Sequence, residues 1–123
     1  MTRGLASGCR GAALLAARTW SHFGVDFACA FFVVGVFAPN APGAAGAGVL
    51  WYNLLAFALQ PLTGALCDRV LPRLGAVGGG LLVALAGLLA AFGWGWPALV
   101  VCALGNALFH PGGGRDVLLL AEG

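Results

Sequence analysis

Long apolar runs separated by short polar turns make up most of this chain. Four of these runs are long enough to cross the hydrocarbon core of a bilayer as helices, which takes roughly 17–25 apolar residues. They cover about residues 20–38, 49–66, 74–92 and 97–114. The pattern predicts an all-α membrane protein with a four-span transmembrane region over residues 20–123, preceded by a cytoplasmic lead-in over residues 1–19.

Composition points the same way. Of the 123 residues, 61% are hydrophobic and 8% are charged, whereas a soluble domain carries about 25% charged residues. This chain has too little polar surface to cover an apolar core in water. The net charge of +2 comes from arginines scattered along the chain, which does not indicate a nucleic-acid partner.

The positions of the arginines predict the orientation in the cell membrane. Arginine-rich segments stay on the cytoplasmic side. The turns near Pro39 and Trp94 carry no charge, whereas arginines precede the first span, follow the second and follow the fourth. We therefore expect both termini in the cytoplasm. The arginines concerned are Arg3, Arg10, Arg18, Arg69, Arg73 and Arg115.

Polar side chains inside the apolar runs are the candidate functional residues. His22 and Asp26 are spaced i and i+4, so both project from one face of a helix. An Asp at the middle of a span costs about 2.5–3.5 kcal/mol to insert, and ionisable groups at that depth commonly serve proton relay or a substrate path. We expect such a path to use Asp26, His110, Asn106, His22, Asn53 and Gln60. The alternative, buried hydrogen bonds that only fix helix packing, is favoured for Asn53, Gln60 and His22 and remains open for His110.

Small residues and prolines predict the helix contacts. Gly75-x-x-x-Gly79 and Gly80-x-x-x-Ala84 allow close approach of two helices, and we expect that neighbour to lie in the same chain. Pro61 is expected to bend the second span. Pro111, followed by three glycines, is expected to end the fourth span or to break it near a cavity.

Enzyme chemistry has no support in the sequence. The four cysteines lie far apart, without the pairing of a zinc site or a disulfide framework, and are expected to be buried and inert. No phosphate-binding loop and no nucleophile elbow is present. We therefore expect no enzyme activity, no cofactor and no metal.

Several motifs resemble one transporter family. The segment Gly64-Ala65-Leu66-Cys67-Asp68-Arg69, followed by Arg73, resembles the G-x-x-x-D-R-x-G-R-R signature between helices 2 and 3 of the major facilitator superfamily. Leu71 and Pro72 depart from that signature. Over residues 20–123, the chain further resembles fosmidomycin-resistance-type exporters and their uncharacterised relatives. The motifs are Ser21-His22-Phe23 with Asp26, Leu59-Gln60-Pro61-Leu62, and Gly105-Asn106-Ala107-Leu108-Phe109-His110-Pro111.

The resemblance implies a twelve-helix transporter in two halves, with helices 1 and 4 lining a central cavity. His22 and Asp26 would then approach Asn106 and His110 across that cavity. Gly64, Asp68, Arg69 and Arg73 would form a cytoplasmic gating motif, with Asp68 and Arg69 acting as a conformational latch. The triglycine Gly112–Gly114 differs from the polar residues expected at that place in the exporters.

A family member needs about three times this length, so we expect either an amino-terminal fragment or an oligomer. The predicted function is secondary active, proton-coupled transport of a small solute. Its partners would be the bilayer, the solute, protons, and the remaining helices or an oligomer partner.

One alternative is a four-helix membrane protein without transport activity that packs or oligomerises through its Gly-rich third span. A homodimer like the small multidrug-resistance proteins fits the length. However, the Glu usual in the first helix of those proteins is missing, and the arginine asymmetry opposes dual topology.

Overall fold

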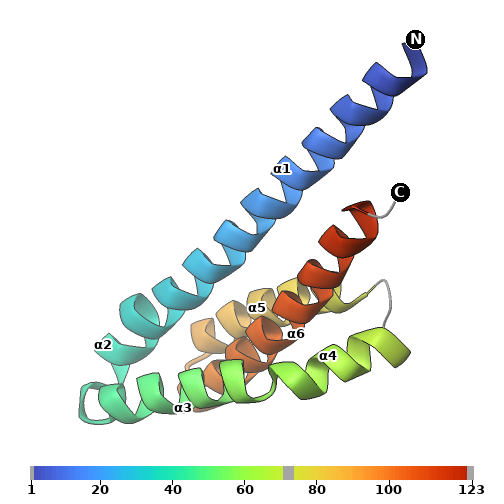
Figure 1. Cartoon of the computed structure of the whole chain (residues 1–123). Helices are drawn as coiled ribbons and strands as arrows, with labels where there is room; N and C mark the ends of the chain where they lie inside the picture. Colours follow the sequence, from blue (N-terminus) through green and yellow to red (C-terminus); the bar gives the residue numbers. More distant parts are fainter. Residues whose placement is uncertain (1, 71–73, 122–123) are drawn as a thin grey trace.

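The computed structural model describes residues 2–70 and 74–121, and the side chains of residues 11–70 and 74–119. Every element in the described ranges is helical and none is a strand, which confirms the all-α prediction. Figure 1 shows one long helix lying diagonally across a group of shorter ones, with both ends of the chain toward the same end of the molecule.

The first helix is much longer than the predicted span. It comprises α1 (Thr2–Phe31), a π-helical segment η1 (Phe32–Phe37) and α2 (Ala38–Asn40) without interruption. The expected lead-in over residues 2–19 is therefore helical and continuous with the first span. The first half of α1 projects beyond the other helices (Figure 1). Residues 2–38 contain no proline and eight alanines, which explains why nothing ends the helix earlier.

The π-helical segment changes which side chains face the core. Phe32, Val33 and Phe37 are all buried, although a regular α-helix would not place all three on one narrow stripe. A π-helical turn is wider than an α-helical turn and is rare. We infer that it forms here because it lets the rings of Phe32 and Phe37 both pack into the core. Nothing in the apolar pattern of this stretch distinguishes it from an ordinary α-helix.

The second predicted span is split into two helices. After the short 3-10 helix η2 (Pro42–Ala44), α3 covers Ala45–Ala58 and α4 covers Gln60–Arg69. The interruption falls at Leu59, and Pro61 occupies the first turn of α4, where a missing backbone N–H costs nothing. The expected bend at Pro61 is confirmed.

The last two helices form the tightest pair. α5 covers Gly75–Ala91 and α6 covers Gly95–Ala121, joined by a turn in which Gly93 takes a φ of 82°, a conformation that favours glycine. A Cβ on Gly79 would lie 2.6 Å from both the Gly105 carbonyl oxygen and the Phe109 amide nitrogen. The Gly75/Gly79 pair thus permits close helix approach within the chain, as predicted. For Gly80, by contrast, no described atom outside its own helix turn lies within 4 Å of the Cβ position.

The expected break of the fourth span at Pro111 is wrong. α6 continues through Pro111 and the three following glycines to Ala121. The reason is packing: a Cβ on Gly112 would collide with the backbone of Gly75 and Ala76 on α5. Gly112 has a low helix propensity, but its lack of a side chain allows α6 to contact α5.

The core is small, and much apolar surface faces outward. Buried residues of α1, η1, α3, α5 and α6 meet in one cluster that includes Cys29, Phe32, Tyr52, Leu99 and Cys102. Cys67 is buried elsewhere, against Gly75, so the three cysteines with described side chains are all buried, as expected.

Two helical stretches, Gly11–Asn40 and Pro42–Arg69, are long and apolar enough to span a membrane, and Gly75–Ala91 is a shorter apolar helix. Large apolar side chains are exposed on every one of the long helices.

Candidate functional site

Three ionisable side chains meet where α1 crosses α6. His110 Nε2 lies 3.1 Å from Asp26 Oδ1, within hydrogen-bonding distance. His22 Nε2 lies 4.0 Å from the other carboxylate oxygen of Asp26, and the two imidazole rings meet edge to face with centroids 4.4 Å apart. We call His22, Asp26 and His110 the His-Asp-His cluster. His22 and Asp26 therefore lie close to His110, as the resemblance implies.

Local packing of α6 lets the two helices meet at this point. The ring of Phe109 lies against His22, with centroids 5.6 Å apart. A Cβ on Gly113 would already lie 4.0 Å from His22 Nδ1, so a larger side chain there would crowd the imidazole. The cluster remains accessible, since the side chains of His22, Asp26 and His110 are 42%, 49% and 22% exposed.

This arrangement supports two kinds of chemistry. A carboxylate beside an imidazole can accept, share and release a proton without any movement of the backbone. A carboxylate oxygen and two imidazole nitrogens are also typical ligands of divalent transition metals. Both uses need the cluster as a unit rather than any one of its members.

Asn106 does not join the cluster, although it shares a face of α6 with His110. Its side-chain amide donates a hydrogen bond of 2.9 Å to the Tyr52 hydroxyl on α3. Asn106 is buried, and its Oδ1 has no hydrogen-bond partner among the described residues. Tyr52, which the sequence analysis did not single out, is also buried. The apolar pattern gives no sign of this pair, because the two residues lie on helices far apart in the sequence.

Asn53 and Gln60 lie apart from the cluster. The Asn53 side chain is exposed and donates a 2.7 Å hydrogen bond to the Val49 carbonyl of its own helix. Gln60 is partly buried at the start of α4, where its backbone carbonyl accepts from Thr63. The Thr63 hydroxyl also donates to the carbonyl of Ala107 and so ties α4 to α6.

The predicted gating motif contacts α6. A Cβ on Gly64 would lie 3.6 Å from Pro111 Cβ, so the small residue allows the two helices to pack. Asp68 forms an ion pair with Arg115 of α6 at 3.5 Å, and the side chain of its neighbour Arg69 is exposed. Arg73 lies outside the described residues.

A second ion pair extends the polar face of α1. Arg18 Nη2 lies 2.7 Å from Asp116 Oδ2, one helical turn before His22. Arg18, His22 and Asp26 therefore form a stripe at i, i+4 and i+8 that faces α6. The sequence analysis used Arg18 only for topology. Its spacing from His22 is the signal that could have identified it as part of the same face.

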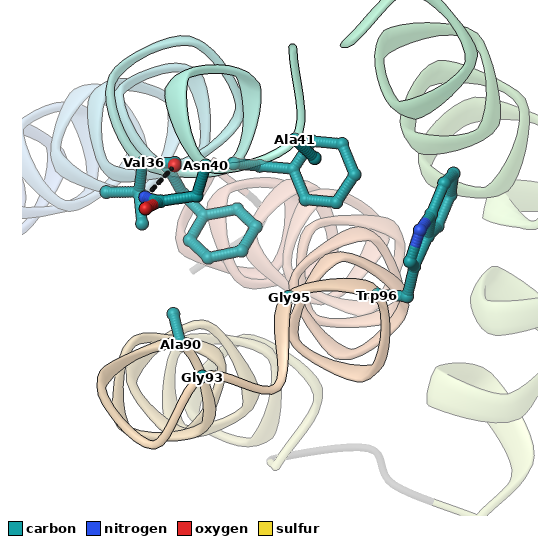
Figure 2. A pocket seen from close by; sticks show the side chains of 9 residues that line it. Val36, Asn40, Ala41, Ala90, Gly93, Gly95 and Trp96 are labelled. Atoms are coloured by element: carbon teal, nitrogen blue, oxygen red, sulfur yellow. Dashed lines mark hydrogen bonds between the residues drawn. The ribbon is translucent and has the colours of Figure 1, made fainter. Parts of the chain in front are cut away.

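An apolar cavity lies near the opposite ends of these helices. It has a volume of about 420 Å³, is partly open, and lies between the end of the first helix and the α5–α6 turn. Figure 2 shows Trp96, Asn40 and Ala41 around it; the Asn40 amide donates to the Val36 carbonyl at 2.7 Å. None of the described residues that line this cavity is ionisable, so the His-Asp-His cluster is the stronger candidate site.

No family model, no curated protein and no solved structure matches this chain.

Proposed function

We propose that this chain is a multi-pass protein of the cell membrane, of the major facilitator type, that takes part in secondary transport of a small solute. The observation that carries the proposal is the His-Asp-His cluster, held between two apolar helices by contacts far apart in the sequence. Three ionisable groups at such a place are costly in a purely structural role, which favours a functional one.

A bilayer environment accounts for the outward-facing apolar surface. Phe23, Phe27 and Phe31 stack along one side of α1 and are each about 60% exposed. Soluble monomers rarely expose contiguous apolar patches of this kind. Lipid, further helices of the same transporter or a partner copy would cover this surface without the penalty that water imposes.

The coupling ion in this proposal is the proton. Asp26 and His110 touch directly and come from different helices, so a change in their shared protonation alters an α1–α6 contact. The ion pairs Arg18–Asp116 and Asp68–Arg115 fix the same end of α6 to α1 and α4. Separation of these pairs would let α6 move while the proton is exchanged.

The test is a solute-dependent proton flux. The full chain is reconstituted in vesicles that contain a pH-sensitive dye, and small solutes are added one by one under a proton gradient. We expect at least one solute to change the internal pH with the wild-type protein. Asp26→Asn should reduce that flux to the level of empty vesicles, because an amide cannot carry the proton.

A matched control separates loss of coupling from loss of folding. Thr19→Ala removes an exposed hydroxyl on the same helix, which donates a hydrogen bond to the Leu15 carbonyl of that helix. This variant and Asp26→Asn should insert into vesicles equally well. An undiminished flux with Asp26→Asn would refute the assignment of Asp26.

A second candidate function is self-association through the exposed small residues on one face of α5. The Cβ positions of Gly80 and Gly87 meet no described atom within 4 Å, and Ala84 between them is exposed. Such a small-residue face could pack against another copy in a protein without transport activity. Crosslinking between Ala84→Cys copies in vesicles, combined with no flux for any solute, would favour this candidate.

A further inference from the structure

We propose that the His-Asp-His cluster is a binding site for a divalent transition-metal cation of the Zn²⁺ class. Among the described residues, these three side chains form a group in which one ligand atom from each lies within 4.8 Å of the others. The inference concerns binding alone and does not depend on transport.

The spacing of the ligand atoms suits a tetrahedral ion. Zinc binds imidazole nitrogen at about 2.0–2.1 Å and carboxylate oxygen at about 2.0–2.2 Å, which puts neighbouring ligand atoms about 3.3 Å apart. In the cluster, His110 Nε2 lies 3.1 Å from Asp26 Oδ1 and His22 Nε2 lies 4.0 Å from Asp26 Oδ2, and one ligand atom from each of the three residues lies within 4.8 Å of the other two. Rotation of the partly exposed side chains can close the remaining difference without moving either helix.

The ligand types select the class of ion. Two imidazoles and one carboxylate favour zinc, copper, nickel or iron, whereas Mg²⁺ and Ca²⁺ prefer sites built from oxygen atoms. Three protein ligands leave one position of a tetrahedral ion for water or another small ligand. Metal binding at this position would fasten α1 to α6.

The surroundings permit a positive ion. The nearest arginine on the same face of α1, Arg18, is held by Asp116 at 2.7 Å, so a carboxylate offsets its charge. The Phe109 ring supports His22 from the other side. With both imidazoles neutral, the cluster carries one negative charge from Asp26, which a divalent cation would compensate.

The first measurement is a calorimetric titration of the full chain in detergent micelles, after treatment with a chelator, with Zn²⁺ and separately with Mg²⁺. We expect one Zn²⁺ per chain and no detectable heat from Mg²⁺ at the same concentrations. His22→Gln, Asp26→Asn and His110→Gln should each weaken Zn²⁺ binding by more than about 10-fold, since each removes a direct ligand. These replacements keep size and hydrogen-bonding capacity, so helix content should be retained.

Asp68→Asn is the matched control, because it neutralises a carboxylate outside the cluster and should leave Zn²⁺ affinity unchanged. Co²⁺ provides a second readout on the wild-type chain that does not depend on variants. Co²⁺ in a tetrahedral nitrogen and oxygen site gives visible absorption without the charge-transfer band of a thiolate ligand. A thiolate band, Zn²⁺ affinity unchanged in all three cluster variants, or no Zn²⁺ binding would each overturn the proposal.

Discussion

Tyr52 and Asn106 form the one direct hydrogen bond between buried side chains that links α3 to α6 in the described part of the chain. Both side chains are buried, so neither can bond to water in place of its partner without the helices moving. A buried polar group left without a partner costs more than the hydrogen bond itself contributes. The pair therefore fixes how α3 sits on α6 as well as stabilising the contact.

Tyr52→Phe should lower the free energy of unfolding by about 1 kcal/mol, because the buried Asn106 amide loses its acceptor. Reversible unfolding in micelles, followed by circular dichroism, measures the change. Asn53→Ala is the control: that side chain is exposed and donates its hydrogen bond to the Val49 carbonyl of its own helix, so its removal should change stability by less than about 0.5 kcal/mol. Equal losses of unfolding free energy in the two variants would mean that the buried Tyr52–Asn106 hydrogen bond stabilises the protein no more than the exposed Asn53 bond does.

Between elements, the α5–α6 contact is decided by which glycine of α5 faces α6. Gly79 meets the backbone of Gly105 and Phe109, whereas its neighbour Gly80 meets open space. A backbone cannot give way as a flexible side chain can, so an added methyl group at position 79 must push the helices apart.

Gly79→Ala should destabilise the protein by about 1–3 kcal/mol, the usual cost of overpacking a tight contact. Gly80→Ala adds the same methyl group one residue along and should be neutral or stabilising by up to about 1 kcal/mol, through helix propensity alone. The same unfolding experiment in micelles compares the two. If Gly80→Ala were the more damaging variant, the face of α5 that packs against α6 would be misassigned.

The sequence predicts elements that depend on local pattern. Apolar runs predict the helices, Pro61 predicts the interruption at Leu59, and the Gly75/Gly79 spacing predicts a close contact within the chain. Features that depend on a distant partner are not predictable in this way. α6 continues through Gly112 because α5 lies against it, and the π-helical segment forms because both Phe32 and Phe37 fill the core.

The same distinction applies to the candidate site. Spacing along one helix predicts that His22 and Asp26 share a face, and the structure places them near each other. Spacing also puts Asn106 and His110 on one face of α6, yet they contact different helices. α1 meets α6 near His110, whereas α3 meets it a turn earlier, and a sequence does not specify where two helices cross.

At the scale of the whole molecule, charge is concentrated at one end. The ion pairs Arg18–Asp116 and Asp68–Arg115 both involve the carboxyl-terminal part of α6, and the two ends of the chain lie toward that end (Figure 1). The end of α2, which contains Asn40, and the turn that contains Gly93 border the apolar cavity and carry no charge. This asymmetry matches the distribution expected when arginines are retained on the cytoplasmic side.

Labelling of single cysteines in intact cells would test that orientation, in a variant whose native cysteines are replaced by alanine. Asn40→Cys should react with a membrane-impermeant maleimide from outside. Val70→Cys, at an exposed position beside the charged end of α4, should react only after the membrane is permeabilised. Neither substitution alters a charge, so the arginine distribution that sets the orientation is preserved. The reverse pattern would place the ion-paired end outside, and labelling of both positions in intact cells would indicate that the chain inserts in two orientations.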